Sequence, residues 1–200
     1  MKKNTILKVN NLSCYRNYIK VFSNINFTLE KGKTLLVKGK NGSGKTSLLL
    51  SISGILPKKG NIRWSSNFYK IGYVGHKNAI RSNETVGEYI RFWKKIFNSK
   101  VDVNKILLEF GLNKLDDFPC NLLSFGQKKI LSFIRLLLLE GRVWLLDEPL
   151  SGLDKKNKDI IIKLIKHHNF SDGAVIMTTH DDHLFKKKIN FKELIIDKNL

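Results

Sequence analysis

The stretch Gly39-Lys40-Asn41-Gly42-Ser43-Gly44-Lys45-Thr46 fits the pattern G-x-x-x-x-G-K-[ST] at every position. It follows an apolar run at residues 34–37 that predicts a buried strand, and it leads into a helix predicted over residues 46–53. Glycines let a backbone curl so that its N–H groups surround phosphate oxygens, and the helix N-terminus adds a positive dipole end. In this pattern Lys45 would contact the β- and γ-phosphates, and the Thr46 hydroxyl would bind Mg²⁺. The stretch therefore predicts a nucleotide site.

An acidic motif follows a second apolar run. Residues 142–149 read Arg-Val-Trp-Leu-Leu-Asp-Glu-Pro, so a buried strand predicted over 143–146 ends in two carboxylates. Asp147, at the strand end beside the phosphate loop, suits Mg²⁺, either directly or through a water. Glu148 is one residue further along and would polarise a water for in-line attack on the γ-phosphate. The pair predicts hydrolysis of the nucleotide as well as binding.

A third motif carries a family resemblance. Leu123-Ser124-Phe125-Gly126-Gln127 opens a helix predicted over residues 128–139, with Ser124 as the N-cap and Gly126 leaving the backbone open to an anion. Placed ahead of Asp147, this motif resembles the signature sequence of the ATP-binding subunits of ATP-binding cassette (ABC) transporters. The resemblance runs from Leu7 to about His183.

The resemblance implies roles that the residues alone do not give. It implies that ATP and Mg²⁺ are the ligands, and that two copies of the chain associate head to tail. Ser124, Gly126 and Gln127 of one copy would contact the ATP held by the phosphate loop of the other. His180, after a strand predicted over residues 174–178, would bond the γ-phosphate and keep the attacking water in register with Glu148. Membrane-spanning transporter subunits would be the partners, with the chain peripheral at the cytoplasmic face of the inner membrane.

Two departures from the general pattern of the family point to one branch. Most members carry a glutamine where this chain has His76, and an aromatic residue that stacks on adenine where an ungapped count gives Arg16, beside Tyr15. Both Arg16 and Tyr15 stay candidates, because a guanidinium plane also stacks on adenine. With Trp64 and the run Glu-Tyr-Ile-Arg-Phe-Trp at residues 88–93, they resemble the ATPases of cytochrome c maturation (haem export). That branch implies release of a holo haem chaperone without direct haem binding by this chain, so His167, His168 and His183 are expected to face solvent.

Short strands alternate with helices along the 200 residues, which predicts an α/β fold. We expect a P-loop NTPase core in one ABC-type domain: a mainly parallel sheet with helices on both faces and an antiparallel β edge. The core would comprise about residues 1–76 and 140–200, with a helical lobe inserted at about 77–139. Further strands are predicted at 6–9, 25–29, 62–64, 71–74 and 194–196, and further helices within 85–110 and at 155–166.

The composition alone does not decide which class of partner the chain binds. Lys and Arg number 36 against 17 Asp and Glu, a formal charge of +19, which suits nucleic acid or an anionic membrane. The chain holds 30 Lys but only 6 Arg, with 19 Asn and two Ala, a bias typical of an AT-rich genome. Because the lysines are scattered, we expect no specific nucleic acid partner. The alternatives are the ATPase of another ABC exporter or importer, and a non-transport ABC ATPase that acts on nucleic acid or ribosomes.

Overall fold

The computed structural model describes residues 4–65, 70–179, 185 and 188–196. In these ranges the strands are β1 (Thr5–Arg16), β2 (Ile19–Glu30), β3 (Thr34–Lys38), β4 (Lys59–Trp64), β5 (Ile71–Val74), β6 (Val143–Asp147), β7 (Ala174–Thr178) and β8 (Phe191–Ile195). The helices are α1 (Lys45–Ile52), α2 (Val86–Phe97), α3 (Val103–Glu109), α4 (Phe125–Leu139) and α5 (Lys155–Phe170), with a short 3₁₀ turn at Cys120–Leu122.

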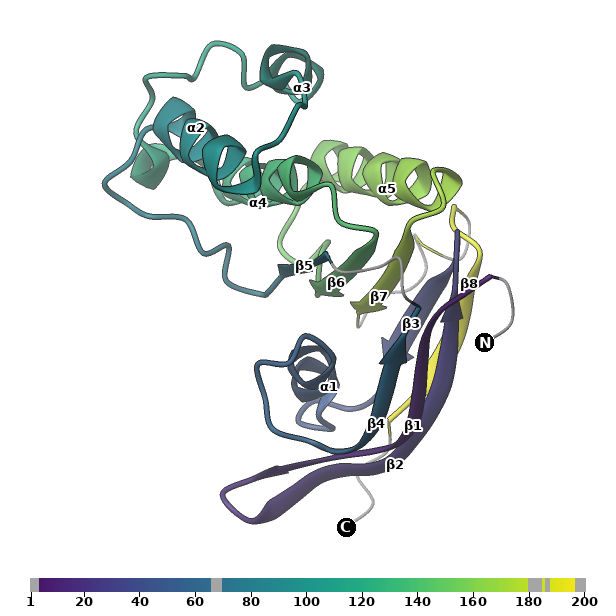
Figure 1. Ribbon diagram of the computed structural model, residues 1–200. Coiled ribbons are helices and arrows are strands. Elements are labelled where there is room, and N and C mark those ends of the chain that lie inside the picture. The colour runs from purple at the N-terminus through teal and green to yellow at the C-terminus, as the bar shows by residue number, and fades with distance from the viewer. Residues whose placement is uncertain (1–3, 66–69, 180–184, 186–187, 197–200) are drawn as a thin grey trace.

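The strands form two sheets, shown in Figure 1. One has five strands in the order β5-β6-β7-β3-β8, and every pairing in it is parallel. The other has three strands in the order β2-β1-β4, paired antiparallel. The predicted α/β class, with a parallel sheet and an antiparallel edge, is confirmed.

Two hydrophobic clusters lie on the two faces of the parallel sheet, because successive side chains of a strand point to opposite faces. In β3, Leu36 belongs to the cluster formed with α4 and α5. Its neighbours Leu35 and Val37 belong to the cluster formed with α1 and the antiparallel sheet. Figure 1 shows α1 on one side of the sheet and α4 and α5 on the other. The central strands β3, β6 and β7 are therefore buried on both faces, which explains why they are continuous apolar runs in the sequence. The edge strand β8 is mostly exposed and contains Lys192 and Glu193.

The antiparallel strands are longer than predicted. β1 and β2 pair along almost their whole length, from Thr5 with Glu30 to Arg16 with Ile19. The register shifts between Val9 and Leu12, where Asn11 has a left-handed φ of 51°. A bulge of this kind breaks the alternation of apolar and polar residues, so the sequence pattern showed only part of each strand.

Helices α2 and α3 lie over α4 at one end of the molecule (Figure 1). α2 begins at a capping box formed by Thr85 and Glu88, and it ends at Asn98, whose φ of 49° is left-handed. Tyr89 of α2 shares one buried cluster with Val74 at the end of β5. Since a single core crosses position 76, the division into a core and a lobe stays a prediction.

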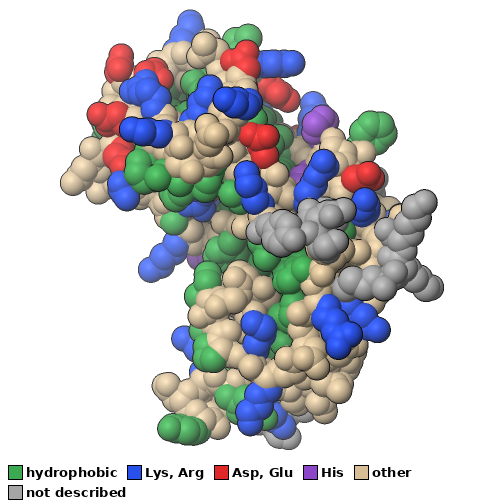
Figure 2. Space-filling model, in the orientation of Figure 1, with side chains coloured by type: hydrophobic (Ala, Val, Ile, Leu, Met, Phe, Trp, Pro, Cys, Tyr) green, Lys and Arg blue, Asp and Glu red, His purple; other side chains and the backbone are tan. Residues whose placement is uncertain are grey.

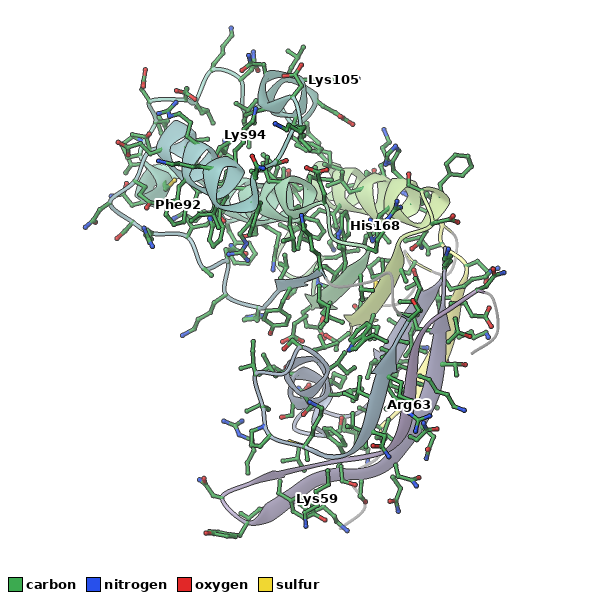
Figure 3. All side chains as sticks on the ribbon, viewed as in Figure 1. Lys59, Arg63, Phe92, Lys94, Lys105 and His168 are labelled. Carbon is green, nitrogen blue, oxygen red and sulfur yellow. The ribbon has the colours of Figure 1, made fainter. Side chains whose placement is uncertain are left out.

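One expectation about the histidines is wrong. His168 lies on the last turns of α5, which runs past the predicted end at residue 166. Its ring stacks on Trp144 with the centroids 3.8 Å apart and an interplanar angle of 8° (labelled in Figure 3). Burial lowers the pKa of His168 to about 4, although hydrogen bonds with the backbone of Arg142 and Ala174 act in the opposite direction. His168 is thus a neutral packing residue. His167 is exposed, as expected, and His183 lies outside the described residues.

Candidate nucleotide site

The site lies at one edge of the parallel sheet, where the carboxyl ends of neighbouring strands meet. β3 leads into the phosphate loop, β5 into Gly75 and His76, β6 ends at Asp147 and β7 ends at Thr178. A cavity of about 410 Å³ opens there. Its walls are Arg16, Val21, Asn41, Gly42, Gly44, Lys45, Thr46, Ser47, His76, Asp147 and Glu148. The sheet topology thus brings together motifs that lie far apart in the chain.

The phosphate loop curls around its own lysine. Lys45 is 7% exposed, and its Nζ donates to the carbonyl oxygens of Gly39 at 2.8 Å and Lys40 at 3.2 Å. Gly44, with a left-handed φ of 100°, precedes the first residue of α1. The Ser43 hydroxyl is buried and has no hydrogen-bond partner among the described residues. A buried hydroxyl without a partner is costly, so the loop fits a ligand rich in oxygen acceptors, such as a chain of phosphates.

The Asp147 carboxylate accepts hydrogen bonds from two hydroxyl groups. Its Oδ2 accepts from Thr46 Oγ1 at 2.8 Å, and its Oδ1 accepts from Thr178 Oγ1 at 2.7 Å. Carboxylate and hydroxyl oxygens are the hard ligands that Mg²⁺ prefers. Thr46 and Asp147 therefore fit the predicted Mg²⁺ site.

Glu148 is held in an unusual backbone conformation. Its φ of 49° is left-handed, which costs a residue with a side chain about 1–2 kcal/mol. The Glu148 N–H donates to Thr178 Oγ1 at 3.0 Å, and this bond helps to hold the turn that brings Glu148 to the cavity wall beside His76. No sequence motif predicts a site role for Thr178. The only signal for it is a polar residue at the end of an apolar strand, which becomes fully buried.

Tyr73 and Gly75 support the segment that carries His76. Burial raises the pKa of Tyr73 to about 12, and the negative charge of Asp147 adds to the shift. A Cβ on Gly75 would lie 3.0 Å from the Tyr73 hydroxyl oxygen, so the phenol packs directly on the backbone ahead of His76. His76 itself is exposed and lines the cavity.

Arg16 and Tyr15, the two candidates for the adenine contact, differ in their position relative to the cavity. Arg16 lines the cavity, whereas Tyr15 is not among the lining residues. The Tyr15 ring lies under Lys59, whose Nζ is 5.2 Å from the ring centroid. This geometry favours Arg16, and the contact with adenine stays a prediction.

The signature residues do not line this cavity. Ser124 and Gln127 form a capping box at the start of α4, with Gln127 N donating to Ser124 Oγ at 3.2 Å and Ser124 N donating to Gln127 Oε1 at 2.9 Å. A Cβ on Gly126 would lie 2.5 Å from the Asn157 amide nitrogen, so Gly126 also lets α4 approach α5. Phe125 is 46% exposed and covers Gly152. His180, which is predicted to bond the γ-phosphate, lies outside the described residues.

Comparison with known proteins agrees with this geometry. Residues 22–151 match the family model described as ABC transporter. The chain belongs to the ABC transporter family. It is an ATP-binding subunit of ABC type, an enzyme that hydrolyses ATP in transport.

Similar proteins narrow the position within the family. The cytochrome c biogenesis ATP-binding export protein CcmA of Reclinomonas americana is 36% identical over 194 residues, covering 90% of this chain and 87% of its own. CcmA of Wolbachia pipientis wMel is 36% identical over 185 residues, covering 88% and 89%. Among solved structures, an inward-facing ABC transporter of metal-chelate type matches 98% of this chain and 81% of its own, with a TM-score of 0.80 and 29% identity. Among the described residues, no helix has the length and apolar character to cross a membrane.

Proposed function

We propose that this ATPase drives membrane-spanning subunits in haem export for cytochrome c maturation, through release of a holo haem chaperone. The observation that carries the proposal is the likeness to CcmA proteins along nearly the whole chain. The site agrees with it, because His76 occupies the cavity wall together with Asp147 and Glu148. A histidine there would bond a Mg²⁺-bound water through one ring nitrogen.

In the proposed reaction, Lys45 turns from its carbonyl partners to the β- and γ-phosphates of ATP. The glycines of residues 39–44 present backbone N–H groups to the same phosphates, and Arg16 stacks on the adenine. A bound Mg²⁺, held by Thr46 and Asp147, would neutralise charge on the phosphates. Glu148 orients the attacking water and accepts its proton, and His180 contacts the γ-phosphate.

The dimer completes the site. Ser124, Gly126 and Gln127 lie outside the cavity of their own phosphate loop, and α4 presents them at its N-terminus. In the head-to-tail dimer they would close on the ATP of the second copy. The partners would be membrane-spanning transporter subunits, with this chain peripheral at the cytoplasmic face of the inner membrane. The basic side chains are spread over the face shown in Figure 2, which supports a general affinity for anionic lipid rather than a nucleic acid groove.

Purification with the membrane partners tests this function. We expect a tagged Glu148→Gln chain, extracted from its own cells in mild detergent with ATP present, to retain the membrane subunits of the haem exporter. Deleting the gene should stop cytochrome c maturation and leave the haem chaperone in its holo form. The wild-type chain should restore maturation, and Lys45→Ala should not, because it lacks the phosphate contact.

The same experiment separates the alternatives. Retention of the membrane subunits of a metal-chelate type transporter, with cytochrome c maturation unaffected by the deletion, would replace haem export with another transport function. Retention of ribosomes or nucleic acid, stable to high salt, would favour a non-transport ATPase.

A further inference from the structure

A buried lysine lies beside the catalytic carboxylates and outside the roles assigned so far. Lys129 of α4 is 1% exposed, and its Nζ donates to the carbonyl oxygen of Gly75 at 3.3 Å. Burial lowers the pKa of Lys129, and the negative charges of Asp147 and Glu148 act in the opposite direction. A buried amino group needs hydrogen-bond acceptors, and the carbonyl oxygen of Gly75 provides one, so Lys129 is tied to the segment that carries His76.

Two more side chains of α4 bind the same segment. Ser132 Oγ lies 2.9 Å from the carbonyl oxygen of Asn78 and 3.1 Å from that of Lys128, and the nearer of the two is the better acceptor for its one hydrogen. Arg135 Nη2 donates to the carbonyl oxygen of Tyr73 at 3.2 Å. Residues three apart on a helix lie next to one another on its surface. Lys129, Ser132 and Arg135 therefore form one polar row on α4, and all three hold backbone oxygens within residues 73–78. We refer to this row as the α4 clamp.

The clamp acts on the peptide group that carries His76. The carbonyl oxygen of Gly75 and the N–H of His76 belong to one planar peptide unit, so fixing the first also fixes the direction of the second. The Tyr73 phenol packs on Gly75, and Lys129 bonds its carbonyl oxygen. Together these contacts restrict the rotation that would swing the His76 side chain along the cavity wall.

The clamp also reaches the helix above it. The Arg135 guanidinium carbon lies 5.3 Å from the centroid of the Trp93 ring, which belongs to α2. Trp93 in turn stacks on Phe97 with the centroids 5.1 Å apart. A shift of α2 or α4 is therefore transmitted to residues 73–78 through direct contacts.

We propose that Lys129, Ser132 and Arg135 are positioning residues that set the place of His76 in the nucleotide site. They make α4 and residues 73–78 move together. When Ser124 closes on the ATP of a second copy, the movement of α4 is therefore transmitted to His76 of the same chain. This proposal rests on the proposed role of His76 in ATP hydrolysis.

Histidine NMR tests the clamp without any requirement for activity. The chain has five histidines, so selective ¹³C labelling gives a simple spectrum in which His76→Gln identifies the His76 signal. Lys129→Met keeps the length of the side chain and removes the bond, and it should shift the His76 signal of the nucleotide-free chain while the His168 signal stays in place. Lys128→Met is the matched control, because Lys128 Nζ donates to the carbonyl of Asn121, outside the segment. Ser132→Ala provides a milder removal if Lys129→Met does not fold.

Kinetics then measure the consequence. We expect Lys129→Met to lower kcat about tenfold, equal to about 1.4 kcal/mol, with KM for ATP within about twofold of wild type. A His76 signal unmoved by Lys129→Met and by Ser132→Ala would overturn the clamp, as would equal effects of Lys129→Met and Lys128→Met on kcat. An unchanged kcat in His76→Ala would instead refute the role of His76 in hydrolysis, and the NMR result on the position of His76 would still stand.

Discussion

At the scale of single residues, Thr178 joins the two acidic residues of the site. Its hydroxyl donates to the Asp147 carboxylate and accepts from the backbone N–H of Glu148, so one side chain orients the first carboxylate and holds the backbone that carries the second. Thr178→Val keeps the shape and removes both bonds, and we expect kcat for ATP hydrolysis to fall about 10- to 100-fold. Thr178→Ser retains the hydroxyl and should keep most of the activity. Equal rates for the valine and serine variants, measured by phosphate release, would show that the hydroxyl does not matter.

His168 makes a second prediction at the residue scale, on stability against pH. Its pKa in the folded chain is about 4, below the ordinary value of 6.5, so the unfolded chain takes up the proton first as the pH falls. The stabilising contribution is therefore complete above pH 6.5 and is lost as the pH falls toward about 4. His168→Phe keeps an aromatic ring against Trp144 but does not titrate. In urea titrations, wild type should lose more free energy of unfolding over this interval than His168→Phe, by up to about 3 kcal/mol. Parallel pH dependences of the two proteins would contradict the assignment.

At the scale of elements, the start of α4 serves both packing and ligand approach, and Gly126 allows the two to be separated. A Cβ there meets the end of the Asn157 side chain on α5, which is free to rotate away, so Gly126→Ala should cost less than about 1 kcal/mol of stability. If an anion of the second copy must approach this backbone, the same change should abolish most ATPase activity. Asn157→Ala provides the space in advance and is the matched background. Recovery of activity in the Gly126→Ala/Asn157→Ala double variant would show that Gly126 is needed only for the packing of α4 on α5, and not for the approach of an anion.

The elements differ in how far the sequence predicts them. The sequence pattern predicts β5 and β7 at their observed bounds, and β7 is recognisable because a strand covered on both faces is continuously apolar. β1 and β2 were predicted in part, since bulges near Asn11 hide their period. Within the site, the phosphate loop, Asp147 and Glu148 follow from local motifs. Thr178 and Lys129 do not, because their roles depend on which strand and which helix lie next to them.

At the scale of the whole molecule, the phosphate loop and the signature residues of one chain lie apart. The cavity is formed by the ends of β3, β5 and β6, while the start of α4 presents Ser124 and Gly126 away from it. A single copy therefore offers a phosphate loop without a signature contact. This arrangement predicts that two copies of the chain associate when ATP is bound and stay apart without it.

Trapping the ATP-bound state makes that prediction measurable. Glu148→Gln retains the shape of the side chain but is a poor proton acceptor, so ATP should bind without being hydrolysed. Light scattering after size exclusion should then give twice the mass of the 23.0 kDa chain with ATP and Mg²⁺, and the monomer mass without them. Adding Lys45→Ala should abolish the dimer because ATP is no longer held, and adding Ser124→Arg should abolish it while ATP still binds to the monomer. A Glu148→Gln chain that binds ATP and stays monomeric at every concentration would rule out closure by this chain alone, whereas loss of the dimer only with Lys45→Ala would place the interface away from Ser124.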